Sequence, residues 1–162
     1  MKRYEYYQPE SLKEAFGLME KYEGRARYVA GGTDVMIRIK QKIWQPEALI
    51  SLRWIEELCG IKKTGNSLRL GSMTLWQEIE TDPLVASHSP ALADAAPMVA
   101  NPQIRNVATV GGNLCNAAPS ADGAPPLMVM EAVLTIAGPH GEREVAISDF
   151  FQRSGTALHA TG

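Results

Sequence analysis

Cysteine is scarce in this sequence. Cys59 and Cys115 are the only two in 162 residues, and they form no Cys-x-x-Cys pair. A disulfide framework, a structural zinc site and an iron–sulfur cluster bound by this chain alone are therefore disfavoured. This usage is typical of intracellular proteins, so we expect a cytoplasmic location, with Cys115 a small packing residue.

Excess charge and long apolar runs are also lacking. The formal net charge is -2, which gives no basic field to attract nucleic acid or anionic lipid. The one basic cluster, "RIKQK" at 38–42, is typical of the solvated face of a helix. The N-terminus has no apolar core, and the longest apolar stretch, residues 123–138, contains two prolines and Glu131. We therefore expect neither a signal peptide nor a membrane span.

The usual sets of catalytic and metal-binding residues are missing as well. No Ser-His-Asp set stands out, no carboxylate pair has a spacing typical of hydrolases, and the histidines lack partners at ligand spacing. We expect no catalytic residue for substrate turnover and no metal ligand in this chain.

The first part of the chain has the pattern of a β–loop–α–β unit. Ser11 with Glu14 forms a capping-box signature ahead of a helix. A strand at 25–30, a helix at 35–43 capped by Thr33 or Asp34, and a strand at 47–52 follow.

The remainder mixes short strands and helices. We expect a hairpin around "TGNS", helices opened by Thr74 and Pro90, a short helix at 124–130 and a strand pair around "GPHGE". This pattern predicts an α+β fold of two lobes, 1–56 and 57–162. The tryptophans are expected in the core or between the lobes: Trp44, Trp54 and Trp76.

A first glycine segment, "YVAGGTDV" at 28–35, joins an expected strand to an expected helix. Two glycines allow a sharp turn and bring main-chain N–H groups close to a ligand, a geometry that suits phosphate oxygens. The alternative is a plain strand-to-helix turn. The segment is neither a Walker loop nor a Gly-x-Gly-x-x-Gly motif. Its candidate binding residues are Tyr28, Val29, Ala30, Gly31, Gly32, Thr33, Asp34 and Val35.

A second glycine segment, "ATVGGNLCNAAPSAD" at 108–122, is almost free of bulky side chains. We expect it to be a loop whose backbone lies flat along an extended ligand, with Asp122 accepting hydrogen bonds from a sugar or polyol. A small-residue surface loop is the alternative. The candidate binding residues are Thr109, Val110, Gly111, Gly112, Asn113 and Asp122.

Lysine and arginine are absent from both segments, and Arg105 is the nearest cation. A diphosphate held mainly by peptide N–H groups is typical of a buried, resident cofactor, whereas exchanged nucleotides usually meet a cation. The two segments therefore predict a bound dinucleotide, and FAD fits because its ribityl hydroxyls need acceptors.

Together with "NPQIRNVATVGGN" and the opening "YYQPESLKEAFGLMEKY", these segments resemble the FAD-binding (medium) subunit of molybdenum hydroxylases. That family includes xanthine dehydrogenases and aerobic carbon monoxide dehydrogenase. The resemblance implies a vanillyl-alcohol-oxidase-type fold with FAD between two lobes, held by residues 28–35, by residues 109–113 and by Asp122. A family aromatic falls on Val99, and the family's C-terminal domain is absent from this sequence.

The resemblance also implies an electron-transfer role in a complex. A large subunit would bind molybdopterin, a small one would hold [2Fe–2S] clusters, and FAD here would pass electrons to NAD or another acceptor. Two alternatives stay open: a stand-alone flavin oxidoreductase, and an assembly module that binds no flavin.

Overall fold

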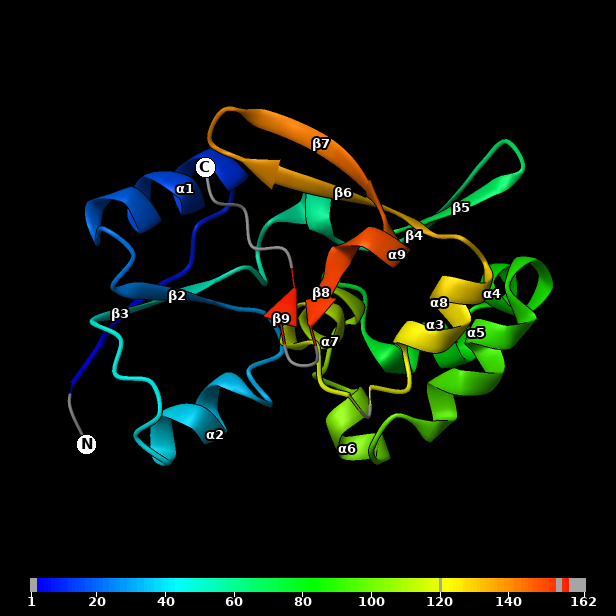
Figure 1. The fold of residues 1–162 in the computed structure, drawn as a ribbon, viewed down its shortest axis with the longest axis horizontal. Coiled ribbons are helices and arrows are strands. Elements are labelled where there is room, and N and C mark those ends of the chain that lie inside the picture. The colour runs from blue at the N-terminus through cyan, green and yellow to red at the C-terminus, as the bar shows by residue number, and fades with distance from the viewer. Residues whose placement is uncertain (1–2, 120, 154–155, 158–162) are drawn as a thin grey trace.

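A computed structural model describes residues 3–119, 121–153 and 156–157. Its first part is a three-stranded parallel sheet in the order β1-β3-β2, accompanied by two helices (Figure 1). The elements are β1 (Glu5–Tyr7), α1 (Leu12–Lys21), β2 (Ala26–Val29), α2 (Val35–Lys40) and β3 (Ala48–Ser51). The predicted β–loop–α–β unit is confirmed, and the first glycine segment leaves the carboxyl end of β2.

Helix α1 begins where the sequence predicts. The Ser11 hydroxyl accepts a hydrogen bond from the Glu14 N–H at 3.2 Å, which satisfies one of the free N–H groups of the first turn. The Glu14 carboxylate accepts from the Glu10 N–H, so the reciprocal half of the box reaches one residue further back. Ala15 is fully buried on this helix and packs against the sheet residues Ala26 and Ala48.

Three two-stranded antiparallel sheets and a set of short helices form the rest, with β6 and β7 running along one side in Figure 1. In chain order the elements are η1 (Glu56–Leu58), β4 (Ile61–Thr64), β5 (Ser67–Leu70), α3 (Trp76–Thr81), α4 (Pro83–His88), α5 (Pro90–Ala95), η2 (Ala96–Met98), α6 (Pro102–Arg105), α7 (Val110–Asn116), α8 (Ala124–Val129), β6 (Val133–Gly138), β7 (Gly141–Ala146), α9 (Ile147–Phe150), β8 (Phe151–Arg153) and β9 (Thr156–Ala157).

Both predicted hairpins and the helices at 90–95 and 124–129 are confirmed. Thr74 does not open its helix, because α3 begins after Leu75. The Thr74 hydroxyl is buried and donates to the Gly60 carbonyl at 3.0 Å. The sequence reading missed α4, although Asp82 caps it by accepting from two N–H groups of its first turn.

Buried side chains gather in separate clusters. The largest is built on α3, α5 and α7 around Trp76, while the sheet of the first part has clusters of its own around Ile50 and Leu49. Trp76 is fully buried, as predicted. The prediction for Trp54 is wrong, since this residue is 56% exposed. Trp44 is partly exposed and packs with Arg38, whose guanidinium carbon lies 4.7 Å from its ring centroid.

The mixed helix-and-strand class is confirmed by these elements. Across the described ranges, none of the helices combines the length and the apolar character needed to span a bilayer.

Candidate functional site

The two glycine segments lie against one another, although many residues separate them in the chain. A Cβ on Gly31 would stand 2.1 Å from the carbonyl oxygen of Val107, just before the second segment. A Cβ on Gly112 would stand 3.4 Å from the Ala30 Cβ. The backbones meet this closely because Gly31 has no side chain. The prediction that both segments share one place in the fold is confirmed.

The first segment leaves its main-chain N–H groups open. Gly32 has a φ of +77°, which bends the chain between β2 and α2. Within the described residues, no hydrogen bond is donated by the N–H of any residue from Gly31 to Val35. The N–H groups of Met36 and Arg38 donate to the carbonyls of Gly32 and Asp34. Successive free N–H groups at a turn form a concavity that binds anions.

The side chains of the first segment mostly turn toward the protein. The Tyr28 hydroxyl donates to the Ala15 carbonyl at 3.3 Å, and burial raises the pKa of this phenol. Val29 belongs to the core. Neither Thr33 nor Asp34 caps α2 with its side chain, and the helix ends at Lys40 rather than at 43, so these predictions are wrong. The main chain is thus what this segment offers a ligand.

The second segment is a helix start rather than a loop. Val110–Asn116 forms α7, and the Thr109 side chain caps it, so the predicted flat loop is wrong. Each N–H from Val110 to Asn113 is already used within the protein. Their acceptors are the Thr74 carbonyl, the Ser72 carbonyl, the Thr109 hydroxyl and the Thr109 carbonyl, at 3.0, 2.9, 3.1 and 3.0 Å. These peptide groups are therefore not free for phosphate here.

Asn113 contributes an acceptor that has no partner. Its Oδ1 is buried and receives no hydrogen bond from the described residues, and the same holds for the Trp76 Nε1 donor. Both side chains border Gly123, where a Cβ would lie 2.9 Å from Asn113 Oδ1 and 2.4 Å from the Trp76 ring. Asp122, which immediately precedes Gly123, is exposed. An unpaired buried acceptor beside the segment is a polar group that a ligand or a water would satisfy.

A polar clasp, defined here as Asp34, Arg38 and Asn116, ties α2 to α7. Arg38 Nη2 donates to Asn116 Oδ1 at 2.7 Å, and Asn116 Nδ2 donates to Asp34 Oδ1 at 3.0 Å. The sequence reading missed it, because "RIKQK" was interpreted as a solvated face. A usable signal was present: Asn116 follows Asn113 by one helical turn, in a helix otherwise made of apolar and small residues.

Arg105, the cation nearest to the second segment in sequence, is buried and forms hydrogen bonds within the protein. It is 7% exposed, its Nε donates to Glu80 Oε2 at 2.8 Å, and its Nη1 donates to the carbonyls of Pro97 and Val99. Val99, the position of the family aromatic, is a buried core residue. Arg105 therefore stabilises the turn around η2 and is not placed to bind phosphate.

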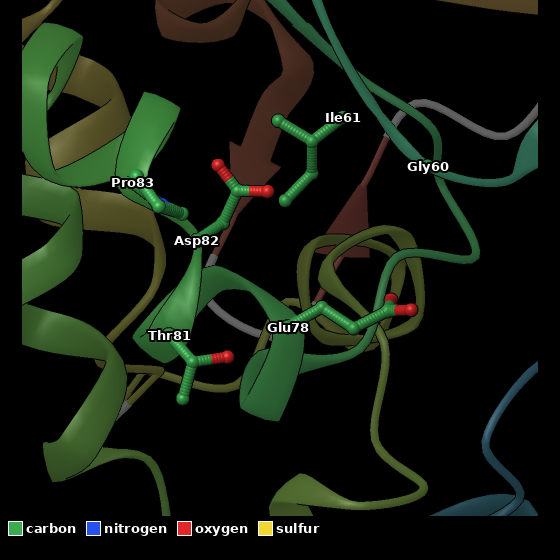
Figure 2. Close-up of a pocket in the computed structure, with 6 residues that line it drawn as sticks. All are labelled: Gly60, Ile61, Glu78, Thr81, Asp82 and Pro83. Atoms are coloured by element: carbon green, nitrogen blue, oxygen red, sulfur yellow. The ribbon is translucent and has the colours of Figure 1, made fainter.

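A shallow pocket of about 290 Å³ lies elsewhere, lined by Gly60, Ile61, Glu78, Thr81, Asp82 and Pro83 (Figure 2). Both carboxylates are occupied in capping, Glu78 by the Leu75 N–H at 2.7 Å and Asp82 by the first turn of α4. Figure 2 shows the two side chains leaving in different directions, with Asp82 toward Ile61. Neither glycine segment lines this pocket.

The remaining candidates are simple to place. Over the described residues, no group of three or more His, Cys, Asp or Glu side chains is arranged to hold a metal ion. Cys115 is exposed, so the packing role predicted for it is wrong, although the protein around it raises the pKa of its thiol by desolvation.

Comparison with known proteins places this geometry in a family context. The family model "FAD binding domain in molybdopterin dehydrogenase" matches residues 2–162. The nicotinate dehydrogenase FAD-subunit of Eubacterium barkeri is 34% identical over 156 residues, which are 96% of this chain and 53% of the relative. The xanthine dehydrogenase FAD-binding subunit of Escherichia coli O157:H7 is 40% identical over 146 residues, 90% of this chain and 50% of the relative.

A solved structure agrees with these sequences. Carbon monoxide dehydrogenase from Hydrogenophaga pseudoflava, in a form that lacks the Mo-pyranopterin moiety, matches with a TM-score of 0.94 and 34% identity. The match covers 98% of this chain and 55% of that one. The chain spans about half the length of the curated relatives it matches.

Proposed function

This chain belongs to the family of FAD binding domains in molybdopterin dehydrogenases, and we propose that it holds FAD where its two glycine segments meet. The contacting residues are those of the first segment (28–35), those of the second (109–113) and Asp122. The observation that carries this placement is the run of unpaired N–H groups from Gly31 to Val35, beside the packed start of α7.

The first segment fits a diphosphate. Free N–H groups attract phosphate oxygens without adding a cation, which is the chemistry expected of a cofactor that stays bound. The packing of Tyr28 and Val29 into the protein keeps the turn in place and leaves its main chain for the ligand. No described side chain competes for these N–H groups.

The second segment supplies one wall of the proposed site, which is the surface of residues 109–113. Its N–H groups are satisfied internally, so its contribution in this proposal is the bare surface of Gly111 and Gly112, together with the unpaired Asn113 Oδ1. Asp122 is exposed near the end of this wall and can accept hydrogen bonds from ribose or ribityl hydroxyls.

When bound, FAD supplies the redox chemistry, and the chain binds it, orients it and limits access by solvent. The partners in this proposal are a large molybdopterin-binding subunit and a small subunit with [2Fe–2S] clusters. Electrons would arrive from those clusters and leave to NAD or another acceptor. The names of the relatives support this role, since they describe FAD subunits of dehydrogenases.

Two finer statements belong to the same proposal. The fold is of the vanillyl-alcohol-oxidase type, with lobes at 1–56 and 57–162, supported by the separate hydrophobic clusters of the sheet and of the helical part. The working location is the cytoplasm, supported by the sparse, unpaired cysteines.

Purification of the native complex, with analysis of its flavin, molybdenum and iron, tests the proposal. We expect FAD and both partner subunits to copurify with this chain. Substrate oxidation by the isolated chain would instead support a stand-alone flavin oxidoreductase. A chain that takes up no FAD, in the complex or on refolding with FAD, would support the assembly module and sink the proposal.

FAD titration of an Asp122→Ala variant tests the proposed acceptor. If the hydrogen bonds of Asp122 become buried on binding, the loss is about 1 to 3 kcal/mol. An affinity equal to that of the unaltered chain would remove Asp122 from the site.

A further inference from the structure

We propose that the polar clasp of Asp34, Arg38 and Asn116 is a positioning device that sets the opening between the two glycine segments before FAD arrives. This inference rests on the proposed function. It assigns Asn116, Arg38 and the carboxylate of Asp34 to the construction of the cleft, with none of the three required to touch the reacting part of the cofactor.

The geometry of the clasp depends on an amide. Asn116 presents Oδ1 to the Arg38 guanidinium at 2.7 Å and Nδ2 to the Asp34 carboxylate at 3.0 Å. An amide side chain offers an acceptor to a cation and a donor to an anion on two separate atoms of one planar group. Arg38 and Asp34, which lie one turn apart on α2, are therefore both joined to α7 through one residue.

Asp34 is occupied on both oxygens. Oδ1 accepts from Asn116, and Oδ2 accepts from the Thr33 hydroxyl at 3.4 Å. Its carboxylate is thus turned toward its neighbours and not toward the free N–H groups of its own segment. A carboxylate free to swing into that concavity would occupy the place of a phosphate and repel it.

Arg38 also contacts Trp44. Its guanidinium lies over the Trp44 ring, with 4.7 Å between the carbon and the ring centroid. A stacked guanidinium loses less conformational freedom when it donates, because its plane is already oriented. The clasp therefore begins from a fixed cation on α2 and ends on α7, whose first turn packs against Ala30 through Gly112.

If the clasp holds the cleft open before FAD arrives, it raises the fraction of molecules that can bind FAD. A higher fraction of competent molecules raises the observed rate of FAD association. Asn116→Asp keeps the acceptor for Arg38 but sets a second carboxylate against Asp34. We expect FAD affinity to fall by about tenfold, with most of the change in the association rate constant.

The decisive variant restores the pairing with exchanged roles. In Asp34→Asn combined with Asn116→Asp, the new amide donates to the new carboxylate, and Arg38 still has an acceptor. We expect Asn116→Asp to weaken FAD binding in the unaltered background and to have an effect below about twofold when Asp34→Asn is present. Such a difference between backgrounds is the signature of direct coupling. Asn116→Ala should weaken binding in both backgrounds.

Tyr22→Phe is the matched control. It removes the 2.8 Å hydrogen bond between the Tyr22 and Tyr7 hydroxyls, in the cluster around Ile50, which includes Tyr28 but none of residues 30–35. It should lower the thermal midpoint slightly and leave the FAD association rate unchanged. That result would show that a small loss of stability alone does not slow FAD association.

FAD binding is followed by flavin fluorescence in stopped-flow mixing with the whole chain, and each variant is also melted without FAD. An Asn116→Asp effect that is absent, or equal in both backgrounds, would overturn the clasp while the proposed function stands. Unaltered protein that binds no FAD would overturn the proposed function. A coupling seen in the melts alone would mean that the clasp joins α2 to α7 without setting a cofactor cleft.

Discussion

The two glycine segments look alike in sequence and differ in the state of their peptide groups. Each places a Gly-Gly pair after an apolar run, ahead of α2 in the first segment and in the first turn of α7 in the second. In the first, the N–H groups from Gly31 to Val35 are unpaired among the described residues. In the second, the corresponding N–H groups are used by Thr109 and by the backbone at 72–74. The same pair of glycines therefore belongs to a turn with free N–H groups in one place and to a close-packed helix start in the other.

The difference has a physical cause at the start of the helix in each segment. Thr109 supplies a hydroxyl that caps α7, while in the first segment Asp34 stands at the N-cap of α2 without capping it. The Thr109 hydroxyl accepts from the Gly112 N–H, and the carbonyls of residues 72 and 74 accept from the two N–H groups before it, whereas the uncapped start of α2 leaves donors for a ligand. Binding capacity thus follows from the absence of a local acceptor and not from the glycines alone.

The largest effect is expected at Arg105, which supports the second segment without belonging to the site. Arg105→Met leaves the partly buried Glu80 unpaired and deprives the carbonyls of Pro97 and Val99 of a donor. We expect the free energy of unfolding to fall by about 3 kcal/mol, as measured by chemical denaturation. FAD affinity at low temperature should change little. A loss of affinity at unchanged stability would instead make Arg105 a ligand.

Gly31→Ala tests the contact between the segments. The added Cβ would meet the Val107 carbonyl oxygen at 2.1 Å, so one backbone must move. We expect a loss of about 2 to 3 kcal/mol in stability together with a loss of FAD binding, followed by denaturation and by flavin titration. Gly17→Ala is the control, because a Cβ there meets nothing within 4 Å. Equal results for the two variants would contradict the close approach.

Gly32→Ala changes only the shape of the binding turn. Its nearest neighbour would be the Val29 side chain at 3.5 Å, so space is not limiting, but the φ of +77° is unfavourable for alanine. We expect a loss of about 1 to 2 kcal/mol in stability. FAD affinity should fall by more than the loss of stability accounts for, because the N–H groups turn away from their ligand. Gly32→Asn, which tolerates this region better, should recover part of both.

The smallest effect is expected at Thr109, which caps α7. Thr109→Ala removes the acceptor of the Gly112 N–H, and we expect a loss of about 1 kcal/mol in thermal or chemical unfolding. Thr109→Ser keeps the hydroxyl and should behave like the unaltered chain. Stronger anion binding by Thr109→Ala would mean that the Gly112 N–H can bind an anion once its internal acceptor is removed, as proposed for the first segment.

The sequence was informative wherever local chemistry decides the structure. The Ser11 cap and both hairpins follow from side chains a few residues apart, and the β–loop–α–β order follows from the apolar pattern of each element. The structure confirms them. The meeting of the two glycine segments was inferred from a shared ligand, and it is confirmed by the Gly31–Val107 contact. The FAD contacts themselves stay a prediction.

The errors share a cause, which is that tertiary partners replaced local ones. Thr74 was expected to cap a helix, but the Gly60 carbonyl takes its hydroxyl. Residues 109–113 were expected to form an open loop, but the backbone at 72–74 draws them into α7. The clasp was missed because Asn116 and Asp34 are 82 positions apart, and the spacing of Asn113 and Asn116 indicates a polar helix face without indicating its partner. No periodicity in the sequence encodes such a pairing.

The close approach of Gly31 to the Val107 carbonyl has a consequence for anyone who would redesign this part of the protein. At that point main chain lies against main chain, so exchanging neighbouring side chains does not move the two segments apart. A change of separation there would need a different path of the polypeptide after β2, whereas the proposed clasp would act from the other end, on α2 and α7.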